Sequence, residues 1–143
     1  MSRHHTVPHV PRAYRDPVNG PDDALALLSV AIAEPLCHET IAIALDDRRC
    51  GGTITVVSDT VSPDAVVDVT EVMCMAMCQN PAIHSLLIAS VRPGGAVCPG
   101  DVDRWLEASA ITDSFGLELL EWFVIGPAGT ECPRDLFGEP ARW

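Results

Sequence analysis

The residues of this sequence that could do chemistry gather around one stretch, residues 84–103, where an apolar run leads into a loop rich in glycine and proline and then into a predicted helix start. The side chains of zinc-binding type near it are Cys98, Asp101 and Asp103, with His38 and Glu39 upstream. A zinc site needs the right ligand count, distances and supporting hydrogen bonds together, and the spacing of these residues does not supply them. We therefore expect no metal or other cofactor, with a zinc site built from these five residues as the alternative.

The loop could also hold a reactive thiol or an anion. Cys98 lies just ahead of the predicted helix start, where a thiolate can be stabilised, but the sequence places no histidine to act as its base, so we expect an inert thiol. Gly94-Gly95 and Pro99-Gly100, beside Arg92, could form an anion-binding turn at a helix N-terminus. Because two aspartates follow at once and would repel an anion, we expect tight turns instead.

Hydrophobic periodicity predicts the elements that must hold this stretch in place. Residues 84–90 have a continuous apolar centre, as in a strand covered on both faces. The pattern predicts helices at 21–34, 69–79 and 100–115, and strands at 39–46, 53–58, 84–90 and 117–125. This order predicts an α/β fold, a single-domain α-β-α sandwich with a central mixed sheet. We expect a flexible N-terminal arm at 1–20, the folded domain at 21–126 and a C-terminal tail at 127–143.

Composition and charge argue against several classes of function. The chain has 143 residues, one domain's worth, and a net charge of −11. That is the wrong sign for binding nucleic acid, which depends on clustered lysine and arginine. No apolar run approaches the ~20 residues that cross a bilayer, and residues 1–20 lack the apolar core of a signal peptide. We expect a cytoplasmic protein that binds neither nucleic acid nor membrane; the sequence leaves its oligomeric state open.

Two other groups of residues have metal-ligand types but a simpler explanation. His4, His5 and His9 lie in the predicted arm and lack residues to fix their geometry, so a solvated tail is expected. Cys74 and Cys78 are one helical turn apart, but a helix rich in methionine and cysteine is more typical of a core. The six cysteines include no Cys-x-x-Cys pair, which favours reduced thiols.

One motif resembles a known family. The residues are Ser90-Val91-Arg92-Pro93-Gly94-Gly95, followed by Pro99-Gly100 and Asp103. Their spacing is that of His-x-His-Pro-Ser-Gly…Pro-Ser-x-x-Asp, the motif of the RadC-like branch of the JAMM (JAB/MPN) metalloprotease fold. Residues 38–46 resemble the Glu-bearing first strand of that family, and residues 115–126 resemble its closing strand, Leu-Gly-Ile-x-Leu-Leu-Asp-His-x-Ile-Ile-Gly. The likeness covers about residues 21 to 126 and implies a JAMM-like fold.

The resemblance also implies a zinc site that this sequence no longer completes. In the family two His and one Asp hold zinc, a Glu on the first strand acts as general base, and the Ser before the Asp helps stabilise the oxyanion. The two His positions are Ser90 and Arg92, and the Ser position is Gly100. Asp103 is the only retained ligand position.

The position of the general base depends on the alignment. Without a gap it falls on His38, and with a slip of one residue it falls on Glu39. A slip of one residue turns a strand side chain to the other face of the sheet, so only one of the two can face the site.

These departures lead to two hypotheses. The first is that the protein is a catalytically degenerate JAMM-like protein, not an enzyme, which acts as a binding or assembly module for a protein partner; the alternative is a zinc-dependent metallopeptidase or isopeptidase with a substituted site. The second is that the guanidinium of Arg92 replaces the charge of the metal by pairing with Asp103. The alternative to this pairing is that Arg92 is a solvated loop residue.

Overall fold

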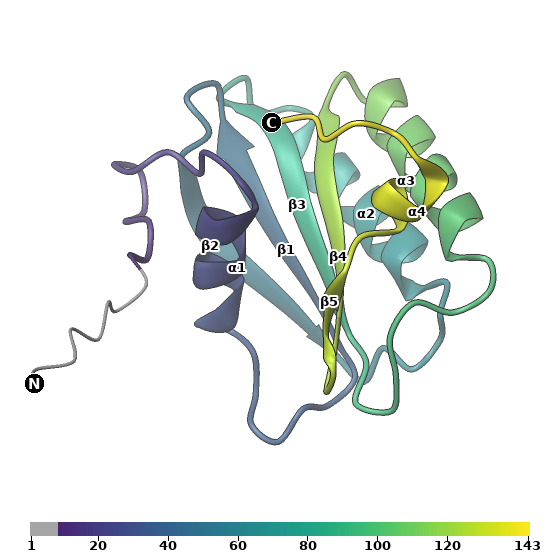
Figure 1. Ribbon diagram of the computed structural model, residues 1–143. Coiled ribbons are helices and arrows are strands. Elements are labelled where there is room, and N and C mark those ends of the chain that lie inside the picture. Colours follow the sequence, from purple (N-terminus) through teal and green to yellow (C-terminus); the bar gives the residue numbers. More distant parts are fainter. Residues whose placement is uncertain (1–8) are drawn as a thin grey trace, which may run out of the picture.

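The fold is built on a five-stranded mixed sheet with helices on both faces, in a computed structural model that describes residues 9–143. The elements are α1 (Pro21–Ser29), β1 (Glu39–Asp46), β2 (Gly51–Ser58), α2 (Ala65–Met77), β3 (Ile83–Val91), α3 (Asp101–Ser114), β4 (Glu118–Gly126), β5 (Gly129–Glu131) and α4 (Pro133–Phe137). The strand order is β2-β1-β3-β4-β5, with β3 and β4 parallel and the other neighbours antiparallel. Helix α1 lies on one face and α2 and α3 lie on the other (Figure 1). The predicted single-domain α/β fold with a central mixed sheet is confirmed. No helix within residues 9–143 is both long and apolar enough to span a bilayer.

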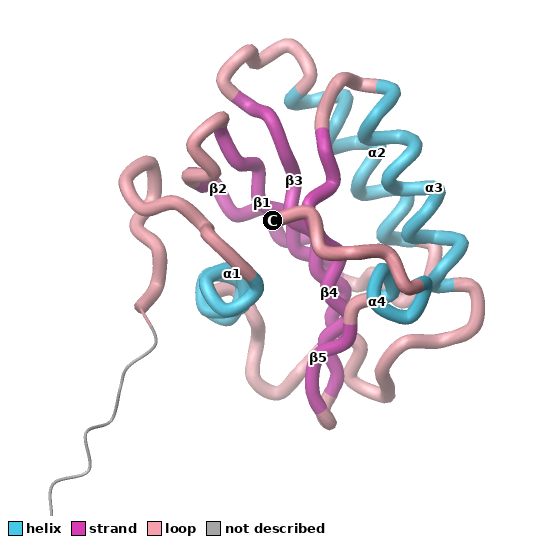
Figure 2. Tube along the Cα trace, turned by 45° about the horizontal axis from the view of Figure 1, so that its top comes forward, coloured by secondary structure: helices cyan, strands magenta, loops and turns pink. Residues whose placement is uncertain are grey.

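Both faces of the middle strands β1 and β3 are buried. Successive side chains of a strand point to opposite faces of the sheet, and most of the side chains of these two strands are apolar. On β1, Ile41 and Ile43 pack in a cluster with α1, whereas Ala42 and Ala44 pack in a second cluster with α2 and α3. Figure 2 shows the sheet between these helical layers. The small alanines allow α2 to approach β1 closely, whereas α3 packs on α2 and β4.

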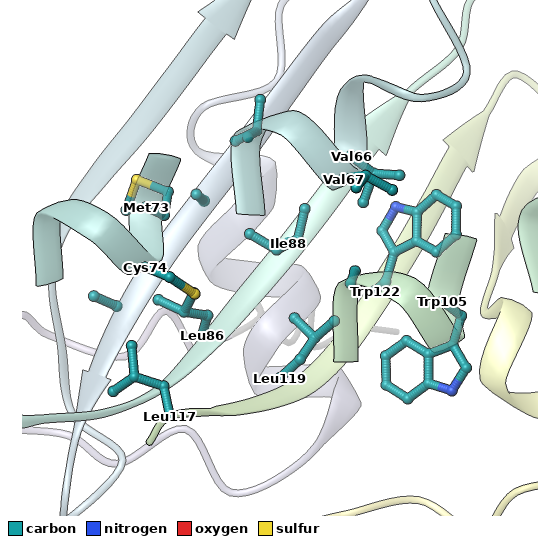
Figure 3. Close-up of a cluster of buried hydrophobic side chains, with 14 of the residues drawn as sticks. Val66, Val67, Met73, Cys74, Leu86, Ile88, Trp105, Leu117, Leu119 and Trp122 are labelled. Atoms are coloured by element: carbon teal, nitrogen blue, oxygen red, sulfur yellow. The ribbon is translucent and has the colours of Figure 1, made fainter. Parts of the chain in front are cut away.

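Two tryptophans fill the core on the side of α2 and α3. Trp105 comes from α3 and Trp122 from β4, and both are fully buried beside Leu86, Ile88 and Leu119 (Figure 3). Aromatic side chains of this size contribute a large part of the apolar area that a core removes from water. This cluster therefore fixes α3 against the sheet.

The boundaries of α1 and α2 differ from the predicted ones, because the apolar pattern and the helix cover different residues. Helix α2 begins at Ala65 instead of residue 69, after a turn in which the Ala65 N–H donates to the Ser62 carbonyl. Helix α1 ends at Ser29 instead of residue 34. Ala31 and Ile32 still pack on the core, so the apolar pattern continues beyond the helix.

Both terminal segments contact the rest of the fold within the described residues. Val18, from the predicted arm, is fully buried, and its N–H donates to the Arg49 carbonyl at 2.8 Å; residues 1–8, with His4 and His5, lie outside the described residues. The predicted tail contains β5 and α4, and Arg142 Nη1 donates to the Leu119 carbonyl at 2.8 Å. These contacts with the sheet, which local sequence does not encode, hold the two segments in place.

The strand directions bring three chain segments to one edge of the sheet. Strand β1 begins at this edge and the parallel strands β3 and β4 end there, because β1 is antiparallel to β3. The Arg92 N–H donates to the Ile125 carbonyl at 2.8 Å, which ties the loop after β3 to the end of β4. In open α/β sheets this edge, outside the carboxyl ends of parallel strands, is where ligands usually bind.

Candidate functional site

A cavity of about 230 Å³ lies at the edge of the sheet where β1 begins and β3 ends. Its wall comes from the start of β1, the connection at 60–65 ahead of α2, and residues 90–98. His38, Ser90 and Arg92, all candidate site residues from the sequence, line it together. The pairing of Thr40 with Ser90 across the two antiparallel strands brings these segments side by side.

His38 and Glu39 lie on opposite sides of the sheet. His38 lines the cavity, whereas Glu39 shares the face on which Ile41 packs toward α1. Glu39 is buried, and its Oε1 accepts hydrogen bonds from the Ala33 N–H at 3.4 Å and the Cys37 thiol at 3.6 Å. The structure thus turns His38, the residue given by the gap-free alignment, to the cavity and turns Glu39 away from it.

Ser90 is held by a tryptophan of the neighbouring strand. Trp122 Nε1–H donates to Ser90 Oγ at 2.9 Å, and both residues are buried. The hydroxyl hydrogen of Ser90 has no acceptor among residues 9–143. Beside it, Thr40 Oγ1 donates to Thr60 Oγ1 at 2.9 Å and joins β1 to the 60–65 connection.

Arg92 pairs with Asp101, and the expected pairing with Asp103 is wrong. Arg92 Nη1 lies 2.6 Å from Asp101 Oδ2, and Nη2 lies 3.0 Å from Oδ1, a two-point ion pair. Nη1 also donates to the Ala96 carbonyl at 3.1 Å, and the guanidinium lies 5.8 Å from the centroid of the Trp122 ring. The side chain is only 14% exposed, so the solvated-loop alternative is also wrong. Asp103, two residues further along α3, is exposed.

Asp101 is enclosed by donors. Its side chain has no exposed surface, and besides Arg92 it accepts from Arg104 Nη1 at 2.9 Å and from the Cys98 N–H at 2.8 Å. Burial alone would raise the pKa of this carboxyl, but the hydrogen bonds from Arg92, Cys98 and Arg104 and the charge of Arg92 outweigh burial and lower the pKa. Asp101 is also the first residue of α3, where the helix dipole favours a negative charge.

Arg104 extends the ion pair to the second helix. Its Nε donates to Asp64 at 2.9 Å, just ahead of α2, and its Nη1 donates to the Pro99 carbonyl at 3.0 Å. The chain Arg92–Asp101–Arg104–Asp64 therefore connects the end of β3 with the starts of α3 and α2. Two arginines and two carboxylates balance in charge, which lets the central pair remain buried.

Gly100 has a structural reason to replace a serine. Its φ of +89° is in the left-handed region that side chains rarely adopt, and a Cβ here would lie 3.1 Å from Arg104 Nη1. The position that the resemblance assigns to an oxyanion-stabilising serine is therefore one where this chain needs glycine.

The loop after β3 packs tightly on the end of β4. A Cβ on Gly126 would lie 2.1 Å from the Gly95 carbonyl oxygen, so only glycine permits this approach. The close contact, together with the bond from the Arg92 N–H to the Ile125 carbonyl, fixes the loop that forms one wall of the cavity.

The five residues considered for a zinc site do not assemble into one. Asp101 is occupied by arginines, Glu39 lies across the sheet and Asp103 is exposed. Within residues 9–143, no three His, Cys, Asp or Glu side chains form a group that could hold a metal ion. Cys98 does line the same cavity as His38, a neighbour that sequence spacing did not reveal.

Other cysteines and acids outside the cavity are structural. Burial raises the pKa of the Cys74 thiol in the core of α2, whereas Cys78 is exposed, so the two do not form a shared site. Glu121 is buried against Arg134 Nε at 2.9 Å, and burial raises its pKa more than the arginine lowers it. Burial next to Glu121 raises the pKa of Cys132 to about 12, so this thiol is not a nucleophile.

Sequence reasoning missed Asp101 as the partner of Arg92, and it missed Trp122 and Arg104 altogether. The one available signal was an aspartate at the first helical position after Pro99-Gly100, where acidic residues are favoured. No protein-family model matches this chain, and no curated protein matches it.

Proposed function

We propose that this protein is a catalytically degenerate member of the JAMM-like fold that works as a non-catalytic binding or assembly module. The observation that carries the proposal is the ion pair between Arg92 and Asp101. It places a permanent cation, which cannot be deprotonated and cannot ligate zinc, at a position where the resembled family has a zinc-binding His.

The other positions of the motif support the same proposal. Ser90 Oγ accepts a hydrogen bond from Trp122, Gly100 has no side chain, and the retained Asp103 is exposed to solvent. A catalytic zinc site needs three protein ligands and one open position, and one exposed carboxylate does not meet that requirement. His38, at the base position, could only act on a water that no metal here would activate.

A protein partner and a cytoplasmic location belong to the same proposal. Val72 and Met75, one turn apart on α2, are 63% and 61% exposed, and large exposed apolar side chains close together often mark a contact surface. All six cysteines are free, as expected in a reducing compartment. The net charge of −11 supports the absence of a nucleic-acid partner.

The metal content of the purified protein tests the proposal against a zinc-dependent peptidase or isopeptidase. Protein produced with zinc in the medium and passed through a desalting column should carry far less than one zinc per chain, measured by plasma mass spectrometry. It should not hydrolyse peptide or isopeptide substrates. About one zinc per chain that disappears in Asp103→Asn would overturn the proposal.

A grafted site tests the JAMM-like frame itself. The double variant Ser90→His/Arg92→His restores the two His positions of the motif and removes one of the two arginines that pair with Asp101. We expect this variant to bind about one zinc per chain, to lose it on the further change Asp101→Asn and to keep it on Asp103→Asn. A folded double variant that binds no zinc contradicts the proposed frame.

A further inference from the structure

We propose that the cavity beside Arg92 binds a small carboxylate with a short apolar body. This inference rests on the proposed function, because a zinc ion in the cavity would compete for the same wall. It names the class of ligand that a non-catalytic module would take up there.

The first argument is the charge of the cavity wall. The chain has 20 acidic residues and a net charge of −11, yet none of the residues that line this cavity is acidic, and Arg92 and His38 are among them. Two other cavities of about 250 Å³ are each lined by at least one carboxylate, Asp46 in both cases. Of these three cavities, the one beside Arg92 therefore repels an anion least.

The second argument is the set of unused donors. Arg92 has five N–H groups, and its hydrogen bonds to Asp101 and the Ala96 carbonyl use three of them. The Nε–H and one N–H of Nη2, along one edge of the guanidinium, have no partner among residues 9–143. Two parallel N–H groups are the arrangement that binds the two oxygens of a carboxylate. The hydroxyl hydrogen of buried Ser90 is a third unused donor in the wall.

Asp101 opposes an anionic ligand less than the sequence suggested. Its oxygens accept from Arg92, Arg104 and the Cys98 N–H, and it is not part of the cavity wall. Its charge does offset that of Arg92, so the site has little net positive charge to spare. A monoanion is therefore favoured over a dianion such as phosphate near pH 7.

The rest of the wall sets the size and polarity of the ligand. Val61, Pro63, Ala65 and Val91 contribute apolar groups to the wall, and Thr60 and Ser90 contribute hydroxyls. A volume of about 230 Å³ is smaller than the roughly 300–1,000 Å³ of pockets for drug-sized ligands, which suits a short-chain carboxylate better than a nucleotide.

The test is a titration of the full 15N-labelled chain, stripped with EDTA, with sodium butyrate. We expect saturable binding with a Kd of roughly 1 mM or tighter, seen as shifts of the Arg92 Nε–H and the Gly94 and Gly95 amide signals. The neutral 1-butanol and inorganic phosphate should each bind at least about tenfold more weakly, because one lacks the carboxylate and the other is a dianion.

Matched variants assign the binding to these residues. Arg92→Lys keeps the charge but removes the paired donors, and should weaken butyrate binding roughly tenfold or more. Ser90→Ala, a second variant in case the first does not fold, should weaken it about threefold to tenfold. Arg12→Lys and Ser58→Ala make the same chemical changes at exposed positions outside the cavity and should leave the affinity unchanged.

The outcomes separate this inference from the proposed function. Metal-free protein that shows no saturable binding, or that binds phosphate or 1-butanol as tightly as butyrate, overturns the carboxylate site and leaves the non-catalytic proposal standing. Equal weakening by Arg92→Lys and Arg12→Lys also overturns it. Protein found with stoichiometric zinc before stripping overturns both.

Discussion

At the scale of single residues, the ion pair of Arg92 and Asp101 is largely removed from water. A buried ion pair adds little to the free energy of unfolding compared with apolar residues of the same shape. Removal of one partner, however, leaves a buried charge without compensation and lowers that free energy. Here Asp101 is fully enclosed, so the cost of losing a partner cannot be relieved by water.

Arg92→Ala should lower the free energy of unfolding by about 2 to 4 kcal/mol, because Arg104 remains as a second partner of Asp101 and softens the loss. Urea denaturation at pH 7 measures this change. In a double-mutant cycle with Asp101→Ala, the two changes should couple by more than about 1 kcal/mol. Arg12→Ala, which breaks an exposed pair with Asp16, serves as the control and should have a much smaller effect. An Arg92→Ala effect no larger than that of Arg12→Ala would contradict the structure.

The lowered pKa of Asp101 predicts how this pair depends on pH. An aspartate in the unfolded chain titrates near pH 3.9, and the folded Asp101 titrates below that. Its stabilisation is therefore complete above about pH 4 and is lost as the pH falls through the folded pKa. Glu121, whose pKa burial raises, changes stability in the opposite direction, so the wild type alone does not isolate Asp101.

The difference in unfolding free energy between the wild type and Asp101→Asn removes the Glu121 contribution. We expect this difference to stay constant from about pH 7 to about pH 5 and to shrink below about pH 4. Urea denaturation across this range measures it. A difference as large at about pH 3 as at about pH 7 would mean that Asp101 is not held as an ionised partner.

At the scale of elements, the junction between the loop after β3 and the end of β4 depends on a missing side chain. Gly126→Ala should cost roughly 1 to 3 kcal/mol of unfolding free energy, because its Cβ would displace the Gly95 carbonyl. It should also shift the amide signals of Arg92 and Ala96. Gly94→Ala, where an added Cβ meets nothing within 4 Å, is the matched control and should be nearly neutral. Equal effects of the two changes would be evidence against the close packing.

The central strands could be predicted from sequence, and the terminal elements could not. The continuous apolar runs at 41–45 and 86–89 predict strands that are buried on both faces. In the structure these runs lie within β1 and β3. The elements β5 and α4 are three and five residues long and depend on tertiary contacts such as Arg134 with Glu121. Such short segments carry too little periodicity to be seen in the sequence.

The choice between Asp101 and Asp103 shows where prediction of the site stops. Two residues in a helix differ by about 200° around its axis, so only one can face Arg92. Which one does so depends on the rotation of α3, which Trp105 sets by packing in the core. Trp105 follows Asp101 by four residues, so the two lie on the same face of the helix. The spacing of the motif identifies the segment that holds the partner of Arg92. The packing of α3 determines which of its two aspartates forms the pair.

At the scale of the whole molecule, a net charge of −11 on one small domain opposes the compact state. Raising NaCl from about 0.01 M to about 1 M shortens the screening length from about 30 Å to about 3 Å. We expect the melting temperature to rise by a few degrees over this range, measured by circular dichroism. The variant Asp68→Asn/Glu71→Gln, which neutralises two exposed acids on α2, should show a smaller rise. A melting temperature that falls with salt would mean that surface ion pairs outweigh the repulsion.

The enclosed pair of Arg92 and Asp101 also constrains how this protein can change over evolutionary time. Loss of Arg92 leaves Asp101 with Arg104 as its one charged partner, and loss of Asp101 leaves Arg92 with none, so single substitutions at these positions pass through a less stable intermediate. Lineages should therefore keep both residues or replace both, and positions 92 and 101 should covary among relatives of this chain. Regaining a metal ligand at position 92 would leave Asp101 with Arg104 as its one charged partner until a metal bound, so the pair acts as a barrier to reversal.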